Sequence, residues 1–263
     1  MKGIIFLFLT SFTLLNSNPT IQQSSSDPKM KTLGLIGGIS WHSTVEYYSY
    51  INQMINDEFK NNINPPLLLY NVNQNLIQRL QRENKLDSVA FILIDAATKL
   101  QNAGAEGIVF CSNTAHKFYD TLSKEVSVPI LHIADATGIA IRKKGLHKVG
   151  LIGTVFTMEE SFIRQRLKQK FDIEMIVPDK NEDRLELHRI VQKELSLGIF
   201  KTETKSYILN QIDLMKQRGA EGMILGSTEF PLIIKQEDVS IPLFNTTLLH
   251  SQMAVDFILG KLK

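Results

Sequence analysis

The sequence is poor in the residues from which disulfide frameworks and metal centres are built. Its 263 residues include one cysteine, Cys111, which excludes an internal disulfide framework and a multi-cysteine metal site. The six histidines show no metal-ligand spacing such as HExxH. Neither GxGxxG nor GxxxxGK followed by Ser or Thr is present, so the common nucleotide-binding signals are missing. We therefore expect no metal site.

Net charge is also small. The 29 Lys and Arg residues nearly balance the 27 Asp and Glu residues, which leaves a formal net charge of +2. No basic patch interleaved with aromatic residues occurs, and both features argue against nucleic acid as a partner. Hydrophobic residues make up 43% of the chain, so we expect a full apolar core rather than disorder in the bulk of the sequence.

The first 29 residues differ in composition from the rest. Lys2 is followed by a mostly apolar run over 3–15 and then by a polar, Ser-rich segment over 16–28. This order is typical of a signal peptide, whose apolar core is too short to cross a membrane as a stable helix. We expect residues 1–29 to be a signal-like, disordered leader of an exported (periplasmic or secreted) protein, with no membrane attachment after its removal. Alternatively, translation from Met30 would give a cytoplasmic protein.

The folded part of the sequence repeats itself at nearly constant spacing. Gly34 and Gly150 are 116 residues apart, and Ser112 and Ser227 are 115 residues apart. Short apolar strands alternate with amphipathic helices in both halves, which implies mainly parallel sheets with right-handed crossovers. We expect an α/β protein of two similar domains related by a pseudo-twofold axis, with a ligand cleft between them. The predicted domains are residues 31–131 plus 246–263, and residues 132–245.

Local patterns specify several elements of the repeat. Ser43 and Thr157 each have a glutamate three residues on, the spacing of a capping box, so both are predicted to start helices. Residues 67–72 are predicted as a buried strand. Residues 73–84 are mostly polar, and no element is predicted there.

Small polar residues follow the strands at the ends where parallel sheets bind ligands. Ser112 and Ser227 hold the same place in the two halves, so each half offers one hydroxyl to a shared cleft. Hydroxyls and backbone N–H groups at the start of a helix make an anion site, and ordinary N-capping is the alternative. The predicted substrate-binding residues are Asn113, Thr114, Gly38, Thr154, Thr157 and Thr228.

Three of these assignments have structural alternatives. Gly38 lets a ligand approach the backbone closely, or it only makes a tight turn. Thr157 binds a carboxylate, or it only caps its helix. Glu229 follows the second hydroxyl and is a candidate to orient it or to act as a base, with a salt-bridged surface carboxylate as the alternative.

The remaining polar residues near the cleft are expected to be structural. Cys111 follows three apolar residues and has no Lys or Arg beside it, so we expect a buried, inert thiol. His116, His132 and His250 lie near the predicted strand ends, where a lone histidine is more often a satisfied structural group than a catalyst.

Four motifs carry a resemblance to a known family. They are LIGGISW at 35–41, CSNTAHK at 111–117, GLIGT at 150–154 with Thr157-Met158, and GSTE at 226–229. With these motifs the chain resembles the cofactor-independent aspartate/glutamate racemases from about residue 31 to its end, in order and without large gaps. The resemblance implies two α/β domains with the site between them, and no cofactor.

In that family two cysteines, one from each half, face the substrate Cα from opposite sides. One thiolate removes the α-proton, and the other thiol returns a proton. At these positions the chain has Ser112 and Ser227, and Cys111 is shifted by one residue, which turns a side chain to the other face of a strand. A hydroxyl is a far weaker base than a thiolate and needs an activating partner. His42 stands where the family usually has an acidic residue, so it either supplies a base or is a surface substitution.

The resemblance therefore implies an amino-acid racemase, an isomerase acting on aspartate, glutamate or a related amino acid. Its expected catalytic residues are Ser112, Ser227, Glu229 and His42. One alternative is a dicarboxylate lyase or isomerase of the same superfamily. Another is a non-catalytic binding protein for acidic amino acids, which the loss of both cysteines favours. The expected partner is a small amino acid or dicarboxylate, and a homodimer is left open.

Overall fold

Two parallel sheets of the same topology form the framework of the protein. The computed structural model describes residues 28–262. The first sheet has the order β2-β1-β3-β4 and the second has the order β6-β5-β7-β8, and every strand pair is parallel. The predicted α/β class with two similar halves is confirmed. The strands are β1 (Leu33–Gly37), β2 (Leu67–Asn71), β3 (Gly107–Phe110), β4 (Ile130–Leu131), β5 (Lys148–Gly153), β6 (Glu174–Ile176), β7 (Met223–Gly226) and β8 (Leu243–Asn245).

Helices alternate with these strands along the chain. In the first half they are α1 (Trp41–Phe59), α2 (Gln74–Arg82), α3 (Leu86–Asn102), the 3₁₀ helix η1 (Thr114–Phe118) and α4 (Tyr119–Leu122). After α5 (Ile133–Lys143) come α6 (Val155–Glu159), α7 (Ser161–Phe171), α8 (Asn181–Lys193), η2 (Leu195–Leu197), α9 (Thr202–Gln217), α10 (Phe230–Ile233), η3 (Gln236–Asp238) and α11 (Thr246–Ile258).

Apolar side chains cover both faces of each sheet. In the first half, the stripe of Val89, Leu93 and Leu100 on α3 packs against one face. On the other face, α1 and α11 contribute a second cluster that includes Tyr47 and Ile51. Burial on both faces explains why the central strands read as nearly continuous apolar runs.

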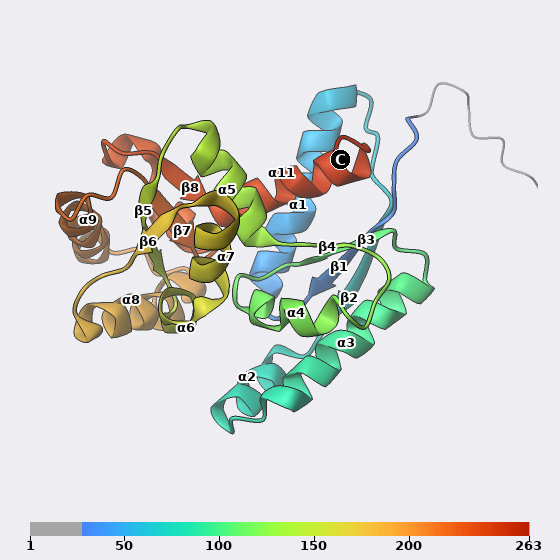
Figure 1. The fold of residues 1–263 in the computed structure, drawn as a ribbon, viewed down its shortest axis with the longest axis horizontal. Helices are drawn as coiled ribbons and strands as arrows, with labels where there is room; N and C mark the ends of the chain where they lie inside the picture. The colour runs from blue at the N-terminus through green and yellow to red at the C-terminus, as the bar shows by residue number, and fades with distance from the viewer. Residues whose placement is uncertain (1–27, 263) are drawn as a thin grey trace, which may run out of the picture.

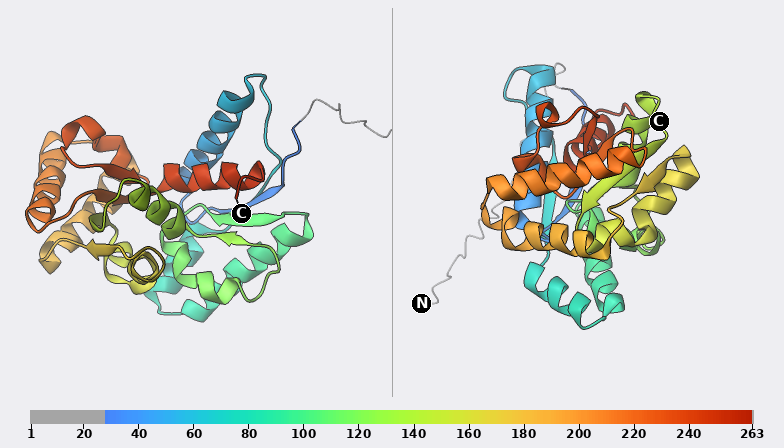
Figure 2. Two further views of the ribbon diagram at one scale, coloured as in Figure 1. Left: turned by 45° about the horizontal axis from the view of Figure 1, so that its top comes forward. Right: turned by 90° about the vertical axis from the view of Figure 1, so that its left-hand side faces the viewer.

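Two segments connect the halves (Figures 1 and 2). The helix α5 leads from β4 to β5, and α11 leads from β8 back across to pack against α1 and α5. The sequence ranges predicted for the two domains stay a prediction. The predicted leader falls mainly on residues 1–27, which lie outside the described residues. Within residues 28–262, no helix combines the length and the apolar character needed to cross a membrane.

The register places corresponding strand ends beside one another. Ile36 of β1 pairs with Phe110 of β3, and Gly153 of β5 pairs with Gly226 of β7. In both sheets these two strands flank the point where the strand order reverses. Ligands of open α/β sheets bind in the crevice outside the carboxyl ends of such strands.

Both predicted helix starts are wrong, in the same direction. The N-cap of α1 is Ser40, whose side chain accepts a hydrogen bond from the N–H of Ser43 at 3.5 Å. The N-cap of α6 is Thr154. Ser43 and Thr157 are therefore the third residues of their helices, and both are buried. Their hydroxyls are not needed as caps and face other groups of the protein.

Two further expectations need correction. The strand predicted for residues 67–72 exists as β2, but it is an edge strand and Leu69 is half exposed. The polar segment 73–84 contains α2, capped by Asn73, which accepts a hydrogen bond from the N–H of Leu76 at 3.1 Å. Only Ile77 of α2 is buried, so the apolar stripe is too narrow to predict the helix from periodicity.

Candidate active site

A cavity of about 510 Å³ lies between the two halves, at the carboxyl ends of β1 and β3 and of β5 and β7. Its size is within the usual range for small-molecule sites. Nine of the ten predicted site residues line it, namely His42, Ser112, Asn113, Thr114, Thr154, Thr157, Ser227, Thr228 and Glu229.

Gly38 is the predicted site residue that does not line the cavity. Its φ is +81°, its N–H donates to Thr44 Oγ1 at 3.0 Å, and an added Cβ would lie 2.2 Å from the Val72 carbonyl oxygen. These contacts belong to the turn between β1 and α1, so Gly38 has the tight-turn role that was the alternative for it.

Ser227 lies beside a carboxylate. Its hydroxyl donates to Glu229 Oε2, and the Thr228 hydroxyl donates to the same oxygen at 2.9 Å. Thr228 Oγ1 also shares a hydrogen bond of 3.0 Å with Ser43 Oγ of α1. This contact joins the two halves across the cavity, and Glu229 has no ion pair within residues 28–262 that would support the salt-bridge alternative.

Ser112 has a different environment. Its Oγ shares a hydrogen bond of 3.2 Å with Thr114 Oγ1. The next residue, Asn113, donates through Nδ2 to Thr246 Oγ1 at 3.1 Å, and Thr246 in turn donates to the Leu225 carbonyl at 2.9 Å. Because the Thr246 proton is used in this way, the amide nitrogen must face Thr246. Asn113 Oδ1 is buried, and within the described part of the chain it has no partner. A buried acceptor without a partner is uncommon in folded proteins, and it marks a place where a ligand or a water can bind.

Thr154 and Thr157 share a hydrogen bond of 3.0 Å between their hydroxyls. Thr157 is fully buried, and an added Cβ at Gly153 or Gly226 would lie 3.1 Å from its side-chain carbons. The two glycines therefore make room for Thr157 at the base of the second half of the cavity.

His42 is exposed on the second residue of α1. Its ring lies against that of Trp41, with centroids 3.7 Å apart. His42 lines the cavity near its opening and forms no hydrogen bond with Ser227 or Glu229 within the described residues. The structure brings it to the site without connecting it to either hydroxyl.

Cys111 is fully buried in the apolar core of the first half, in the cluster that includes Leu35 and Tyr47. Burial raises the pKa of its thiol far above the ordinary value. The expectation of a buried cysteine is confirmed, and a protonated thiol is a poor nucleophile and a poor base near neutral pH.

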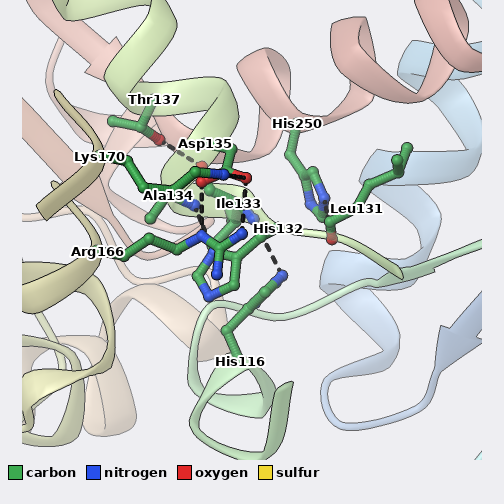
Figure 3. Close-up of polar contacts among 10 residues, drawn as sticks. All are labelled: His116, Leu131, His132, Ile133, Ala134, Asp135, Thr137, Arg166, Lys170 and His250. Atoms are coloured by element: carbon green, nitrogen blue, oxygen red, sulfur yellow. Dashed lines mark hydrogen bonds and ion pairs between the residues drawn. The ribbon is translucent and has the colours of Figure 1, made fainter. Parts of the chain in front are cut away.

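Three buried histidines, His116, His132 and His250, lie close together (Figure 3), and His116 holds the Ser112 loop. His116 Nε2 accepts a hydrogen bond from the N–H of Ile133 at 3.1 Å, so its Nδ1 carries the proton and donates to the Ser112 carbonyl at 2.9 Å. His132 caps α5 by accepting from the N–H of Ala134, and His250 lies 3.1 Å from the Leu131 carbonyl. Burial lowers the pKa of His116 to about 4 and also lowers those of His132 and His250. The three rings are neutral structural groups, as expected.

Two ionisable residues of the cavity wall are among those that were not predicted. Arg82 of α2 and His188 of α8 face the cavity from opposite halves. Arg82 is exposed and forms no ion pair within residues 28–262, while partial burial lowers the pKa of His188. Arg82 is the one lining residue of the described chain with a permanent positive charge. Arg82 could have been predicted as a lining residue only if α2 had been predicted, because that helix carries Arg82 to the cavity.

Within residues 28–262, no group of three or more His, Cys, Asp or Glu side chains is arranged to hold a metal ion. The polar groups of the cavity are hydroxyls, amides, the imidazoles of His42 and His188, and two oppositely charged side chains, Arg82 and Glu229. Such a set can bind a small zwitterion and can move a proton at Glu229.

Comparison with known proteins links this geometry to a family. The family model of Asp/Glu/Hydantoin racemase matches residues 36–254. The chain is similar to a Yersinia pestis protein assigned as an Asp/Glu racemase, with 41% identity and a TM-score of 0.83 over 88% of this chain and 100% of that one. It is also similar to an aspartate racemase homologue from Pyrococcus horikoshii OT3, with 37% identity and a TM-score of 0.78 over 87% and 99% of the two chains.

A shorter match is to the broad specificity amino-acid racemase RacX of Bacillus subtilis (strain 168). Identity is 33% over 82 residues, which are 31% of this chain and 36% of RacX. The match therefore spans about a third of the length of that relative.

Proposed function

Because this chain belongs to the Asp/Glu/hydantoin racemase family, we propose that it is a racemase-like enzyme that moves the α-proton of an acidic or related amino acid. Membership of the family supports isomerase activity in general terms. The substrate and the residues that carry out the reaction are the proposal.

The observation that carries the proposal is the pair of hydroxyls. Ser112 follows β3 and Ser227 follows β7, both line the same cavity, and they are 9% and 7% exposed. An amino acid bound between the halves would present opposite faces of its Cα to the two serines. Inversion of configuration requires access to both faces, and two serines on opposite halves would supply it.

The polar groups of the cavity suit an amino-acid zwitterion. Asn113 Oδ1, which has no partner within residues 28–262, would accept a hydrogen bond from the α-ammonium group. The hydroxyls of Thr114 and Thr154 are donors for the α-carboxylate. Arg82 would hold a second carboxylate at the opening of the cavity, which favours an acidic substrate.

A second candidate function is non-catalytic binding of an acidic amino acid. The observation in its favour is that the one thiol of the chain is buried in the core and that hydroxyls stand in the cavity. A serine hydroxyl without an activating partner is a poor base, so a protein with this cavity could bind its ligand without turnover.

Hydrogen exchange in D₂O distinguishes the two functions. The full chain is incubated with each common amino acid as a single enantiomer. Loss of the α-¹H signal is followed by NMR, binding by calorimetry, and configuration by chiral chromatography. For the racemase-like enzyme we expect deuterium at the α-position of an acidic amino acid and formation of its antipode.

Ser227→Ala is expected to abolish exchange, while the exposed surface variant Ser123→Ala leaves it unchanged. Binding of an acidic amino acid without any α-exchange would contradict the racemase-like function and support the binding protein.

A further inference from the structure

The two serines of the cavity differ in their access to a proton acceptor. The Ser227 hydroxyl points its proton at Glu229 Oε2, which leaves its oxygen lone pairs free for another proton. The Thr228 hydroxyl donates to the same carboxylate oxygen and holds it in place. Ser227 and Glu229 therefore form a hydroxyl–carboxylate pair of the kind that activates a weak nucleophile or base.

Ser112 has no such partner among residues 28–262. Its hydroxyl contacts only the hydroxyl of Thr114, which is no more basic than itself. Cys111, the residue directly before Ser112, is ionisable, but its side chain lies in the core. His116 reaches the Ser112 loop, but it contacts the backbone carbonyl and not the hydroxyl.

His116 cannot act as a base for the substrate in its observed position. Its Nε2 accepts from the N–H of Ile133, and its Nδ1 proton is shared between the carbonyls of Ser112 and Asn113 at 2.9 and 3.2 Å. Both ring nitrogens are therefore occupied. A proton taken from a substrate would have to displace one of these buried hydrogen bonds, which is costly.

The other ionisable residues on the cavity wall do not provide a base for Ser112. Arg82 is protonated at all relevant pH values and accepts no proton. His42 and His188 line the cavity, and neither hydrogen-bonds to Ser112. Within residues 28–262, only the second half therefore presents a hydroxyl coupled to a base at the cavity.

On the premise of the proposed function, we propose that proton transfer in this cavity is one-sided. Ser227 with Glu229 removes and returns the α-hydrogen at one face of the substrate, and Ser112 acts as a hydrogen-bonding group at the other face. The protein then exchanges the α-hydrogen of one enantiomer with retention of configuration faster than it racemises the amino acid.

The step balances without a further reactant. The Cα–H bond breaks as an O–H bond forms at Ser227, and the original Ser227 proton passes to Glu229. The electron pair stays on the substrate, delocalised into its carboxylate. Reversal returns a hydrogen to the same face. In D₂O the Ser227 hydroxyl, which now carries the hydrogen taken from the substrate, exchanges that hydrogen for deuterium through Glu229 and solvent before reversal, so the hydrogen that returns is deuterium.

The test measures exchange and inversion separately. The full chain is mixed with L- or D-aspartate, and with L- or D-glutamate, in D₂O. NMR follows loss of the α-¹H signal, and chiral chromatography follows configuration. We expect one enantiomer to exchange at least about tenfold faster than it inverts, and its antipode to exchange at least about tenfold more slowly.

Variants at equivalent positions of the two halves identify which half transfers the proton. Ser112→Cys is expected to raise inversion relative to exchange, because it supplies a thiol at the unassisted face. The matched Ser227→Cys substitution leaves the ratio of exchange to inversion high. Glu229→Gln keeps the size of the side chain but removes the proton acceptor, and it should lower exchange by about 100-fold or more.

The outcomes separate the inference from the premise. Equal rates of exchange and inversion, starting from either enantiomer, would overturn the one-sided inference and leave the racemase-like function standing. Exchange that survives in Glu229→Gln would also overturn the inference. No exchange with any amino acid that binds would overturn the racemase-like function, and the inference with it.

Discussion

A single position in the strand decides which side chain reaches the cavity. Val109 and Cys111 both lie in the core cluster formed with α1 and α11, whereas Ile108 and Phe110 lie in the cluster on the other face of the sheet. The thiol therefore follows the alternation of the strand into the core. Ser112 is the first side chain beyond this alternation, and it enters the cavity.

Arg82 allows the preference for an acidic substrate to be tested at one residue. Arg82→Gln removes the positive charge from the cavity opening and keeps a polar side chain. Because Arg82 is exposed, we expect a modest effect, a rise of about fivefold in KM for aspartate or glutamate with little change in kcat. The measurement is the initial rate of α-exchange against substrate concentration.

Arg79 provides the matched control for this substitution. It is also exposed on α2 but does not line the cavity, so Arg79→Gln should leave KM unchanged. An equal KM in Arg82→Gln and in the unmodified protein would show that the second carboxylate is not held by Arg82.

The turn between β1 and α1 is a demanding element of the fold. Gly38→Ala would place a methyl carbon 2.2 Å from the Val72 carbonyl oxygen at a φ of +81°, so backbone would have to move. We expect a loss of about 3 kcal/mol or more in the free energy of unfolding, measured by urea denaturation.

A substitution at Gly145 separates the cost of the left-handed backbone from the cost of the contact with Val72. The φ of Gly145 is +72°, and an added Cβ there would meet nothing within 4 Å. Gly145→Ala should therefore cost only the left-handed conformation itself, about 1 kcal/mol. Equal losses in the two variants would mean that the contact with Val72 adds nothing.

The sequence is most informative for the elements that repeat. The strands and the positions of Ser112 and Ser227 could be predicted, because apolar runs and small polar residues recur 115 residues apart. The helix starts could not, because Ser40 and Ser43 are both acceptable caps. In the structure Ser40 is the cap, and Ser43 instead contacts Thr228, which is 185 residues away in the sequence.

The lining role of Arg82 could not be predicted for a related reason. The helix α2 has little apolar surface, so its periodicity gives no signal, and its place opposite α8 depends on tertiary packing. Local sequence therefore predicts the symmetric part of the site, and the part that differs between the halves depends on tertiary contacts.

At the scale of the molecule, buried histidines lie where the two halves meet. His116 joins the Ser112 loop to the start of α5, while His250 on α11 lies 2.8 Å from the Tyr47 hydroxyl of α1. Asp135 of α5 binds Arg166 and Lys170 of α7 (Figure 3). Burial alone would raise the pKa of Asp135, but the hydrogen bonds from Arg166 and Lys170 outweigh it and lower that pKa. The two connecting helices, α5 and α11, are therefore held by side chains whose hydrogen bonds depend on their protonation state.

The stability of the molecule should depend on pH through these histidines. Burial holds the pKa of His116 at about 4, below the ordinary value near 6.5, so between these values the unfolded chain binds more protons than the native one. Stability is then complete above pH 6.5 and falls toward pH 4, by about 1 kcal/mol per pH unit for each such histidine. Urea denaturation at several pH values measures this slope.

His116→Gln should lower stability at pH 7.5 and flatten the slope, while His147→Gln, at an exposed histidine, leaves it unchanged. A slope that His116→Gln does not alter would contradict this origin of the pH dependence.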